Sequence, residues 1–233
     1  MIFKQLFDSV SSTYTYIVAE KNGEAVIIDP VKAHVQFYIQ LIKDLGLKLV
    51  FAIDTHVHAD HVTGAGDLED LTECMSVMGE MTAATCVSRR VKEGETIRVG
   101  AHALKTLYTP GHTDDSYSFL MKDRVFTGDT LLIRSTGRTD FQNGSAAQQY
   151  DSIFNKLLTL DDGTLLYPAH DYKGWTVSTI GEEKAYNTRL HVPSEQAYVA
   201  MMNALKMDNP KLMDIAVPAN LKCGRGYSDE KKS

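Results

Sequence analysis

The sequence contains little of what marks a disulfide-rich, membrane-spanning or nucleic-acid-binding protein. Its 233 residues include three cysteines, Cys74, Cys86 and Cys223, and no C-x-x-C pair, so we expect reduced thiols rather than a disulfide framework or a zinc knuckle. The longest stretch without a charged side chain runs from Ser9 to Ala19, which is too short to span a bilayer. The net charge is −6 and no Lys or Arg run exceeds Arg89–Arg90. We therefore expect no nucleic acid and no membrane among its partners.

The N-terminal residues also lack the features of a targeting segment. The first ten, MIFKQLFDSV, have no basic start, no apolar core and no small-residue cleavage site, unlike a secretory signal. Acidic residues come early, at Asp8, Glu20 and Glu24, and no Arg does, which disfavours a mitochondrial transit peptide. Together with reduced cysteines, these absences predict a cytoplasmic protein.

Hydrophobic patterns predict mainly strands in the first half of the chain and more helices in the second. The runs typical of strands are Thr13–Ala19, Glu24–Asp29, Lys48–Asp54, Thr96–Val99, Ala103–Tyr108, Tyr117–Met121, Arg124–Thr127 and Thr164–Tyr167. Helical spacing extends from Val35 to Leu45 and from Tyr150 to Leu158, the latter preceded by a capping-box Ser145, and Ser194 caps a third helix. Hairpins with peripheral helices predict one domain over residues 1–233, ending in a disordered tail of about eight residues.

The most informative segment is the string HVHADH at residues 56–61, directly after a predicted strand. Residues two apart in an extended segment point to the same side, so His56 and His58 can approach one point. Asp60 and His61, in the turn that follows, can face a second point. Imidazoles and a carboxylate that converge on one loop suit a first-row divalent metal ion.

Three later residues repeat this placement of a potential metal ligand just after a strand. His112 follows YTPG, Asp129 follows VFTG, and His170 follows LYPA. Each residue alone is common in turns. Four strand ends that carry His or Asp together favour a metal site at one edge of the fold.

These motifs, THVHADH, TPGHTDDS, FTGD and PAHDY, resemble in order and spacing the metal-site motifs of the metallo-β-lactamase superfamily. The resemblance implies an α/β fold, an αββα sandwich in which helices cover two mixed sheets and the metal lies at their open edge. Two longer segments, LLIRSTGRTDF and YPAHDYKGWTVST, resemble the persulfide dioxygenases, also called sulfur dioxygenases. The similarity runs from about residue 2 to residue 224. It departs at Thr188, where a proline is usual, and over Cys74–Arg90, which carries none of the motifs of this resemblance.

This resemblance implies an enzyme with one Fe(II) per chain, held by His56, His112 and Asp129. Two histidines and one carboxylate leave open positions on the iron, which a reaction with O2 requires, whereas redox-inert zinc could not perform it. The remaining motif residues would hold a second metal in hydrolytic relatives. Here they are expected to orient ligands and hold water; they are His58, Asp60, His61 and His170.

The substrate that the resemblance implies is glutathione persulfide, which O2 oxidises to sulfite and glutathione. Arg138 is the expected contact to a glutathione carboxylate, because its planar guanidinium matches that anion. A structural ion pair of Arg138 with Asp140 remains the alternative. Tyr172 and Lys173 are further candidate substrate-binding residues. Members of the family often form dimers, so the resemblance also implies a possible homodimer.

The closest alternative is a glyoxalase II-type hydroxyacylglutathione hydrolase, in which all seven motif residues hold two metals and Asp129 bridges them around a hydroxide. The segment GRTDF and the short C-terminal region favour the dioxygenase over this hydrolase. A non-catalytic scaffold of the same fold is a third alternative. It is disfavoured because degenerate relatives generally lose ligands and this chain has lost none.

Overall fold

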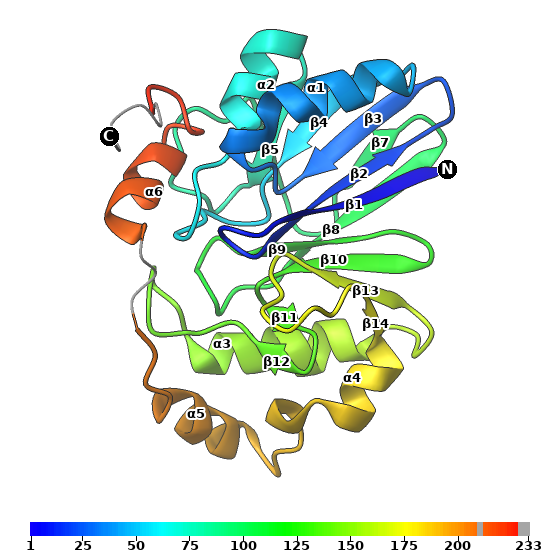
Figure 1. Cartoon of the computed structure of the whole chain (residues 1–233). Helices are drawn as coiled ribbons and strands as arrows, with labels where there is room; N and C mark the ends of the chain where they lie inside the picture. The colour runs from blue at the N-terminus through cyan, green and yellow to red at the C-terminus, as the bar shows by residue number, and fades with distance from the viewer. Residues whose placement is uncertain (209–211, 228–233) are drawn as a thin grey trace.

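The computed structural model describes residues 1–208 and 212–227 and shows two β-sheets packed face to face, with helices on their outer sides (Figure 1). The first sheet has the order β1-β2-β3-β4-β5-β6 and the second has the order β14-β13-β10-β9-β8-β7. Helices α1 and α2 cover the first sheet, whereas α3, α4 and α5 lie below the second (Figure 1). The expected αββα sandwich is therefore confirmed.

The strands of the first sheet are β1 (Ile2–Asp8), β2 (Thr13–Ala19), β3 (Glu24–Ile28), β4 (Lys48–Ile53), β5 (Met75–Gly79) and β6 (Arg89–Val91). Those of the second sheet are β7 (Thr96–Val99), β8 (His102–Tyr108), β9 (Tyr117–Leu120), β10 (Arg124–Gly128), β13 (Leu165–Pro168) and β14 (Ser178–Thr179). A separate hairpin consists of β11 (Leu131–Leu132) and β12 (Ser135–Thr136). Both large sheets are mixed, because β3 to β6 run parallel and so do β10 and β13.

The helices are α1 (Val35–Asp44), α2 (Ala65–Thr72), α3 (Ala146–Asp151), α4 (Ile180–Tyr186), α5 (Glu195–Asn203) and α6 (Met213–Asn220). Short 3-10 turns occupy Lys32–His34, Leu157–Thr159 and Thr188–Leu190, and a π-helical turn occupies Ser152–Lys156. No helix among the described residues is both long and apolar enough to cross a membrane.

The core lies between the two sheets and explains the alternating strands of the sequence. Tyr16 and Ile28 of the first sheet pack in one buried cluster with Phe119 and Phe126 of the second. Each such large side chain stabilises the fold by about 1.5–3 kcal/mol when it is fully buried. The outer faces form two further clusters, one beneath α1 and α2 and one beneath α3 and α5.

The helix expected over Tyr150–Leu158 is shorter and less regular than its pattern suggests. Its first turn is as predicted, because the Ser145 hydroxyl accepts a hydrogen bond from the Gln148 N–H. From Ser152 onward the chain continues as a π turn and then a 3-10 turn. Apolar spacing cannot separate these forms, because the three place similar faces toward the sheet over so short a length.

The expectation of three reduced cysteines is wrong for two of them. Cys86 and Cys223 form a disulfide across 137 residues of sequence, and Cys74 is free and buried. Pairing depends on how close two cysteines lie in the folded chain, and their spacing in the sequence carries no signal of it. The Cys74–Arg90 stretch forms β5, β6 and the loop that carries Cys86. Residues 228–233 of the expected tail lie outside the described residues.

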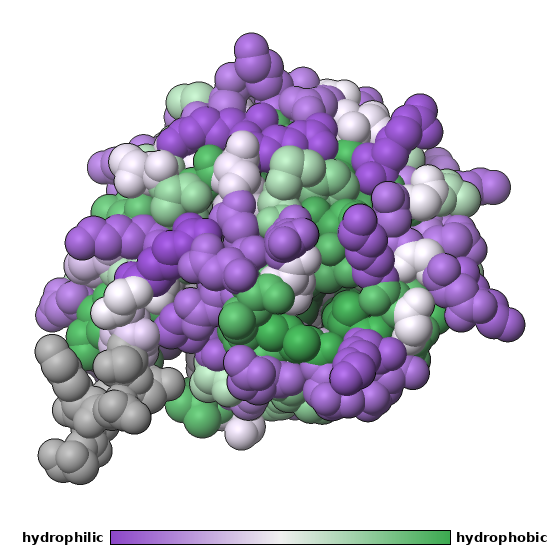
Figure 2. Space-filling model, turned by 90° about the horizontal axis from the view of Figure 1, so that it is seen from above, coloured by the Kyte–Doolittle hydropathy of each residue, from purple (hydrophilic) through white to green (hydrophobic). Residues whose placement is uncertain are grey.

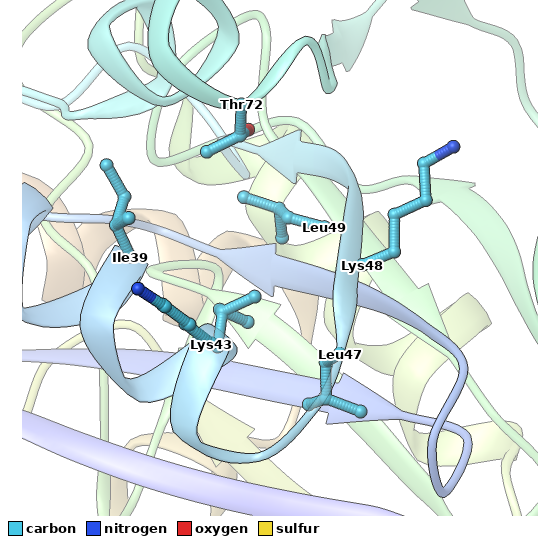
Figure 3. A pocket seen from close by; sticks show the side chains of 7 residues that line it. Ile39, Lys43, Leu47, Lys48, Leu49 and Thr72 are labelled. Carbon is cyan, nitrogen blue, oxygen red and sulfur yellow. The ribbon is translucent and has the colours of Figure 1, made fainter.

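A small cavity of about 350 Å³ opens at the start of β4, at the end opposite to the histidine string (Figure 3). Its lining comes from α1, the α1–β4 connection, β4 and the end of α2, with the residues Ile39, Lys43, Leu47, Leu49 and Thr72. The surface seen from above α1 and α2 is mixed, with apolar patches set among hydrophilic side chains (Figure 2). This cavity contains no histidine or acidic side chain, so it is unrelated to the candidate metal residues.

Candidate metal centre

The strand ends place every predicted metal-site residue at one edge of the sandwich. The string at 56–61 follows β4, and His112 lies in the connection between β8 and β9. Asp129 follows β10 directly, and His170 follows β13. Because β10 and β13 are parallel neighbours, their C-terminal ends bring Asp129 and His170 side by side.

Three of these side chains converge in a first group, His56, His112 and Asp129. Their potential ligand atoms all lie within 4.8 Å of one another. The imidazole rings of His56 and His112 are 4.9 Å apart, and the Nε2 atom of His112 is 3.6 Å from Oδ2 of Asp129. This spacing suits donors around a single ion.

The other four motif residues form a second group beside the first. Ligand atoms of His58, Asp60, His61 and His170 also lie within 4.8 Å of one another. The Oδ2 atom of Asp60 is 2.9 Å from Nδ1 of His61 and 2.8 Å from Nε2 of His170. The structure thus gathers all seven residues, in the two groups that the family resemblance implies. The expectation from strand alternation that His56 and His58 share one point is wrong, because the two residues fall in different groups.

Hydrogen bonds to the far side of two rings leave a ring nitrogen free to bind a metal. The Nδ1–H of His112 donates to the carbonyl oxygen of Arg138 at 2.8 Å, which leaves the Nε2 lone pair facing Asp129. The Thr55 hydroxyl donates to Asp29 at 3.1 Å, so it accepts from Nδ1 of His56 at 3.0 Å. Such partners fix the tautomer and orientation of a ligand histidine.

Asp29 is a residue of the site that the sequence analysis missed. Its carboxylate accepts hydrogen bonds from the backbone and hydroxyl of Thr55, and lies 3.1 Å from Nε2 of His58. Burial raises the pKa of Asp29 to about 6, whereas the nearby histidines and the hydrogen bonds from Thr55 favour its charged form. The sequence could have indicated Asp29, because it directly follows a predicted strand, as Asp129 does.

Two buried nitrogens of the second group are placed as metal ligands would be. Nδ1 of His58 and Nε2 of His61 are buried and have no hydrogen-bond partner. An unsatisfied buried polar atom costs about 1–3 kcal/mol, a cost that a metal ion would offset. Burial, together with the neighbouring histidines, lowers the pKa of His56 and His58 well below the usual value. Neutral imidazole is the form that binds metals.

His170 differs from the other histidines because both its nitrogens face carboxylates. Nδ1 lies 2.7 Å from Oδ1 of Asp129, and Nε2 lies 2.8 Å from Oδ2 of Asp60. Burial opposes its charge, but these carboxylates raise the pKa of His170 well above the usual value. Likewise burial would raise the pKa of Asp129, but His170, His112 and His56 hold it below the ordinary range.

A cavity of about 810 Å³ leads from the surface to His112, Asp129 and His170. Its volume suits a drug-sized molecule. All three predicted substrate contacts line it, namely Arg138, Tyr172 and Lys173. Tyr172 is 69% exposed, so its ring stands at the mouth of the cavity rather than in the core.

Arg138 forms the ion pair that the sequence left as an alternative. Its Nε and Nη2 atoms donate to the two carboxylate oxygens of Asp140 at 2.7 and 2.8 Å. Nη1 donates to the carbonyl of Asp208 at 2.6 Å. The guanidinium of Arg138 is therefore already paired within the cavity wall. The backbone carbonyl of the same residue orients His112.

Comparisons with known proteins agree with this architecture. Residues 8–170 match the family model described as the metallo-beta-lactamase superfamily. The chain is 46% identical to the mitochondrial persulfide dioxygenase ETHE1 of Mus musculus, over 96% of this chain and 89% of that protein. The crystal structure of ETHE1 from Myxococcus xanthus superposes with a TM-score of 0.93 at 51% identity, over 96% of this chain and 100% of that one. A hydroxyacylglutathione hydrolase of Dictyostelium discoideum is 30% identical over 68% of this chain and 62% of its own.

Proposed function

The chain belongs to the metallo-beta-lactamase superfamily and, within it, to the persulfide dioxygenases, and from this premise we propose that it oxidises glutathione persulfide. One persulfide, one O2 and one water would give one glutathione, one sulfite and two protons. We propose His56, His112 and Asp129 as the ligands of one Fe(II) per chain. When bound, this iron would supply electron transfer to O2 and open positions for the reactants.

The observation that carries a single-metal site is the position of His170. Its Nδ1 lies 2.7 Å from Oδ1 of Asp129 and its Nε2 lies 2.8 Å from Oδ2 of Asp60, which supports a role in holding these two carboxylates. The same contact leaves Oδ2 of Asp129 directed at His112. His170 and Asp60 would thus keep Asp129 charged and oriented, rather than bind an ion themselves.

The cavity supports a tripeptide persulfide as substrate. Arg138, Lys173 and Arg189 bring positive charge to its wall, and glutathione has two carboxylates. We propose that Arg138 and Lys173 bind these carboxylates and that Tyr172 covers the bound peptide at the cavity mouth. Holding the sulfur in one position removes much of the entropy cost of its encounter with O2.

An oxygen-electrode assay of the anaerobically iron-loaded protein tests this function. With glutathione persulfide we expect oxygen consumption and an equal amount of sulfite, with about one iron per chain by metal analysis. The same protein loaded with zinc should consume no oxygen, because zinc has no accessible redox change. Absence of turnover after ferrous reconstitution would reject the proposal.

A dinuclear thioester hydrolase is the second candidate, and the buried nitrogens of His58 and His61 favour it. Neither atom has a partner, and both belong to the group that would hold a second ion. Two metals per chain and turnover of a lactoylglutathione thioester would establish this function instead.

The cellular location and the oligomeric state of the protein are further proposals. We propose a cytoplasmic protein, although the mouse relative is named as mitochondrial, and a homodimer as in related enzymes. Cell fractionation tests the first proposal, and light scattering of the purified protein tests the second.

A further inference from the structure

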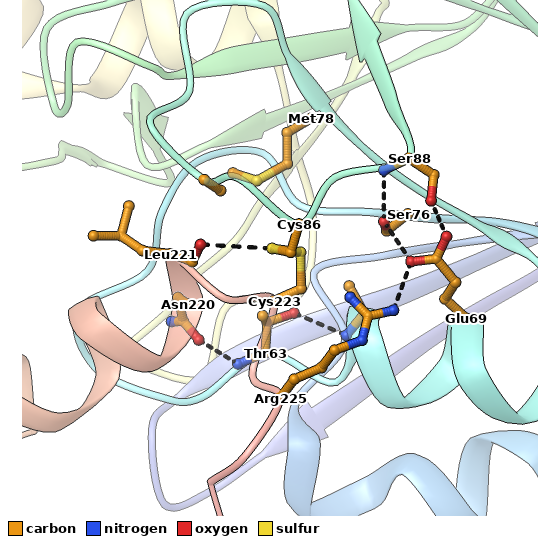
Figure 4. The surroundings of a disulfide bond; sticks show 12 residues. Thr63, Glu69, Ser76, Met78, Cys86, Ser88, Asn220, Leu221, Cys223 and Arg225 are labelled. Carbon is orange, nitrogen blue, oxygen red and sulfur yellow. Dashed lines mark hydrogen bonds and ion pairs between the residues drawn. A yellow bond between two sulfur atoms is a disulfide. The ribbon is translucent and has the colours of Figure 1, made fainter.

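The C-terminal segment, residues 213–225, packs against the loop that carries the first metal-site histidines (Figure 4). We call residues 56–66, which include the first two residues of α2, the histidine loop. Asn220, at the end of α6, is buried and touches this loop with its whole amide group. Its Nδ2 donates to the carbonyl oxygens of His58 and His61 at 2.8 Å each, and its Oδ1 accepts from the N–H of Thr63 at 2.9 Å. One side chain thus satisfies three backbone groups of the histidine loop.

The backbone of the C-terminal segment also lies close to the backbone of the histidine loop. The N–H of Gly66 donates to the carbonyl of Cys223 at 3.0 Å. A Cβ at Gly224, whose φ is +74°, would lie 2.1 Å from the carbonyl oxygen of Thr63. The position of the C-terminal segment therefore bears directly on the backbone that presents the histidines.

Few apolar contacts hold the C-terminal segment in this place. Val217 and Leu221 pack against a small cluster in which Val57, Met78 and Ala84 are the buried members. Arg225 adds ion pairs with Asp70, which is exposed, and with Glu69, which is half-buried. The segment therefore depends on this small cluster, on its polar contacts and on its covalent connection for its position.

The Cys86–Cys223 disulfide adds a covalent connection at this point. It joins the C-terminal segment to the loop before β6 (Figure 4). In the same loop the Thr85 N–H donates to the Leu221 carbonyl at 3.2 Å. Cys223 is only 2% exposed, whereas Cys86 is half-buried. Because Cys86 is the more exposed of the two residues, an external thiol would approach the disulfide from its side.

We propose that the Cys86–Cys223 disulfide is a thiol-reducible connection that holds Asn220 on the histidine loop, so that the oxidised protein retains its metal ion more firmly than the reduced protein. The redox state of the surrounding thiols would then set how well the metal site persists. This inference depends on the metal centre, but it does not depend on the persulfide reaction.

The exchange chemistry needs only a low-molecular-weight thiol, such as the glutathione that the proposed reaction releases. A thiolate attacks Sγ of Cys86, a mixed disulfide forms there, and Cys223 leaves as a thiolate. A second thiolate attacks the external sulfur of the mixed disulfide and releases Cys86 as a thiolate. The two protons lost by the external thiols pass to the two cysteines. Two thiols are oxidised to one disulfide, and the protein disulfide is reduced.

Hydrogen exchange of the iron-loaded protein in oxidising and reducing glutathione buffers, under argon, tests the proposal. We expect peptides that contain Thr63 and Gly66 to exchange about tenfold faster after reduction, because the disulfide no longer limits opening of the segment. Transfer of Fe(II) to a chelator should accelerate by about the same factor. Both readouts are independent of persulfide turnover, so an inactive protein still gives a result.

Three variants separate the proposed cause from others. Cys86→Ser should behave as the reduced protein in either buffer, whereas Cys74→Ser should keep the buffer dependence, because Cys74 is free and buried. Asn220→Ala should speed exchange and iron loss with the disulfide intact. Equal exchange and iron loss in the two buffers would overturn the proposal, as would peptide mapping that finds no disulfide in aerobic protein. If Cys86→Ser fails to fold, the two-buffer comparison of the natural protein still decides.

Discussion

The histidines of the candidate metal centre are oriented by hydrogen bonds with neighbouring groups. The Arg138 carbonyl and the Thr55 hydroxyl each contact one nitrogen of a histidine ring and leave the other nitrogen for a metal. Asp29 in turn accepts from Thr55 and contacts His58. The centre is thus oriented by groups that are not themselves ligands, as is usual for metal sites.

Replacement of Asp129 by alanine should abolish both iron retention and oxygen consumption. The variant removes the only carboxylate of the proposed ligand set, and we expect the iron affinity to fall at least about a hundredfold. Metal analysis after gel filtration and an oxygen electrode measure the two effects. Asp162→Ala, which changes an exposed acid paired with Lys184, is the control and should leave both unchanged. Oxygen consumption preserved in Asp129→Ala would contradict the ligand assignment.

Replacement of Arg138 by alanine distinguishes substrate binding from wall structure. If the guanidinium binds a carboxylate of the substrate, KM should rise about 10–100-fold, the value of a charge-assisted hydrogen bond, with iron content unchanged. Steady-state kinetics with iron analysis measure this.

The variant Asp140→Asn provides the matched comparison, because it weakens the ion pair and keeps Arg138. We expect its KM to stay near that of the natural protein. If both variants instead lose thermal stability alike and neither changes KM, Arg138 serves the cavity wall only.

Helix α3 shows how an element positions a ligand. The loop before His112 contacts the N-terminus of α3, where the N–H of the N-cap Ser145 donates to the Gly111 carbonyl at 2.9 Å. The Ser152 hydroxyl donates to the Pro110 carbonyl at 2.7 Å. The direction of His112 therefore depends on the contact of this loop with α3.

Replacement of Gly111 by alanine should disrupt this contact. Gly111 has φ +138°, and a Cβ there would lie 2.3 Å from Cα of Gln149. We expect a loss of about 2 kcal/mol or more in the free energy of unfolding and weaker iron binding, measured by denaturant titration and metal analysis. Gly163→Ala, where a Cβ meets nothing within 4 Å, should change the stability by about 0.5 kcal/mol or less. Equal stability of the two variants would refute the role of this contact.

For the molecule as a whole, the proposed metal site joins the two sheets. His56 follows β4 of the first sheet, whereas Asp129 follows β10 of the second and His112 lies between β8 and β9. An ion bound by all three stabilises the folded state, because the unfolded chain does not assemble this site.

Removal of iron should therefore lower the melting temperature of the whole molecule. An ion present at about a thousand times its Kd contributes about 4 kcal/mol, which corresponds to about 8–16 °C for a chain of this size. Calorimetry before and after chelation measures the shift. Asp129→Ala should melt at the same temperature with or without iron. A natural protein that is indifferent to chelation would exclude an ion that joins the sheets.

The sequence alone determined eight of the strands, the helix caps at Ser145 and Ser194 and the residues gathered at the metal centre, whereas β1, β5, β6, β11, β12 and β14 were not predicted. Strand runs such as Thr13–Ala19 and the cap at Ser145 are local, because alternation and capping depend on residues a few positions apart. The motif residues were also predictable, since strand ends of a packed sheet meet at one edge.

Only the tertiary structure decided the contacts between segments distant in the chain. Asn220 reaches Thr63 across 157 residues, and Cys86 pairs with Cys223 across 137, and no periodicity reports such distances. The structure likewise decided that Arg138 pairs with Asp140 and that both nitrogens of His170 face carboxylates. Local patterns encode which face of an element is buried, whereas the partner of each polar group depends on how the packed elements bring distant residues together.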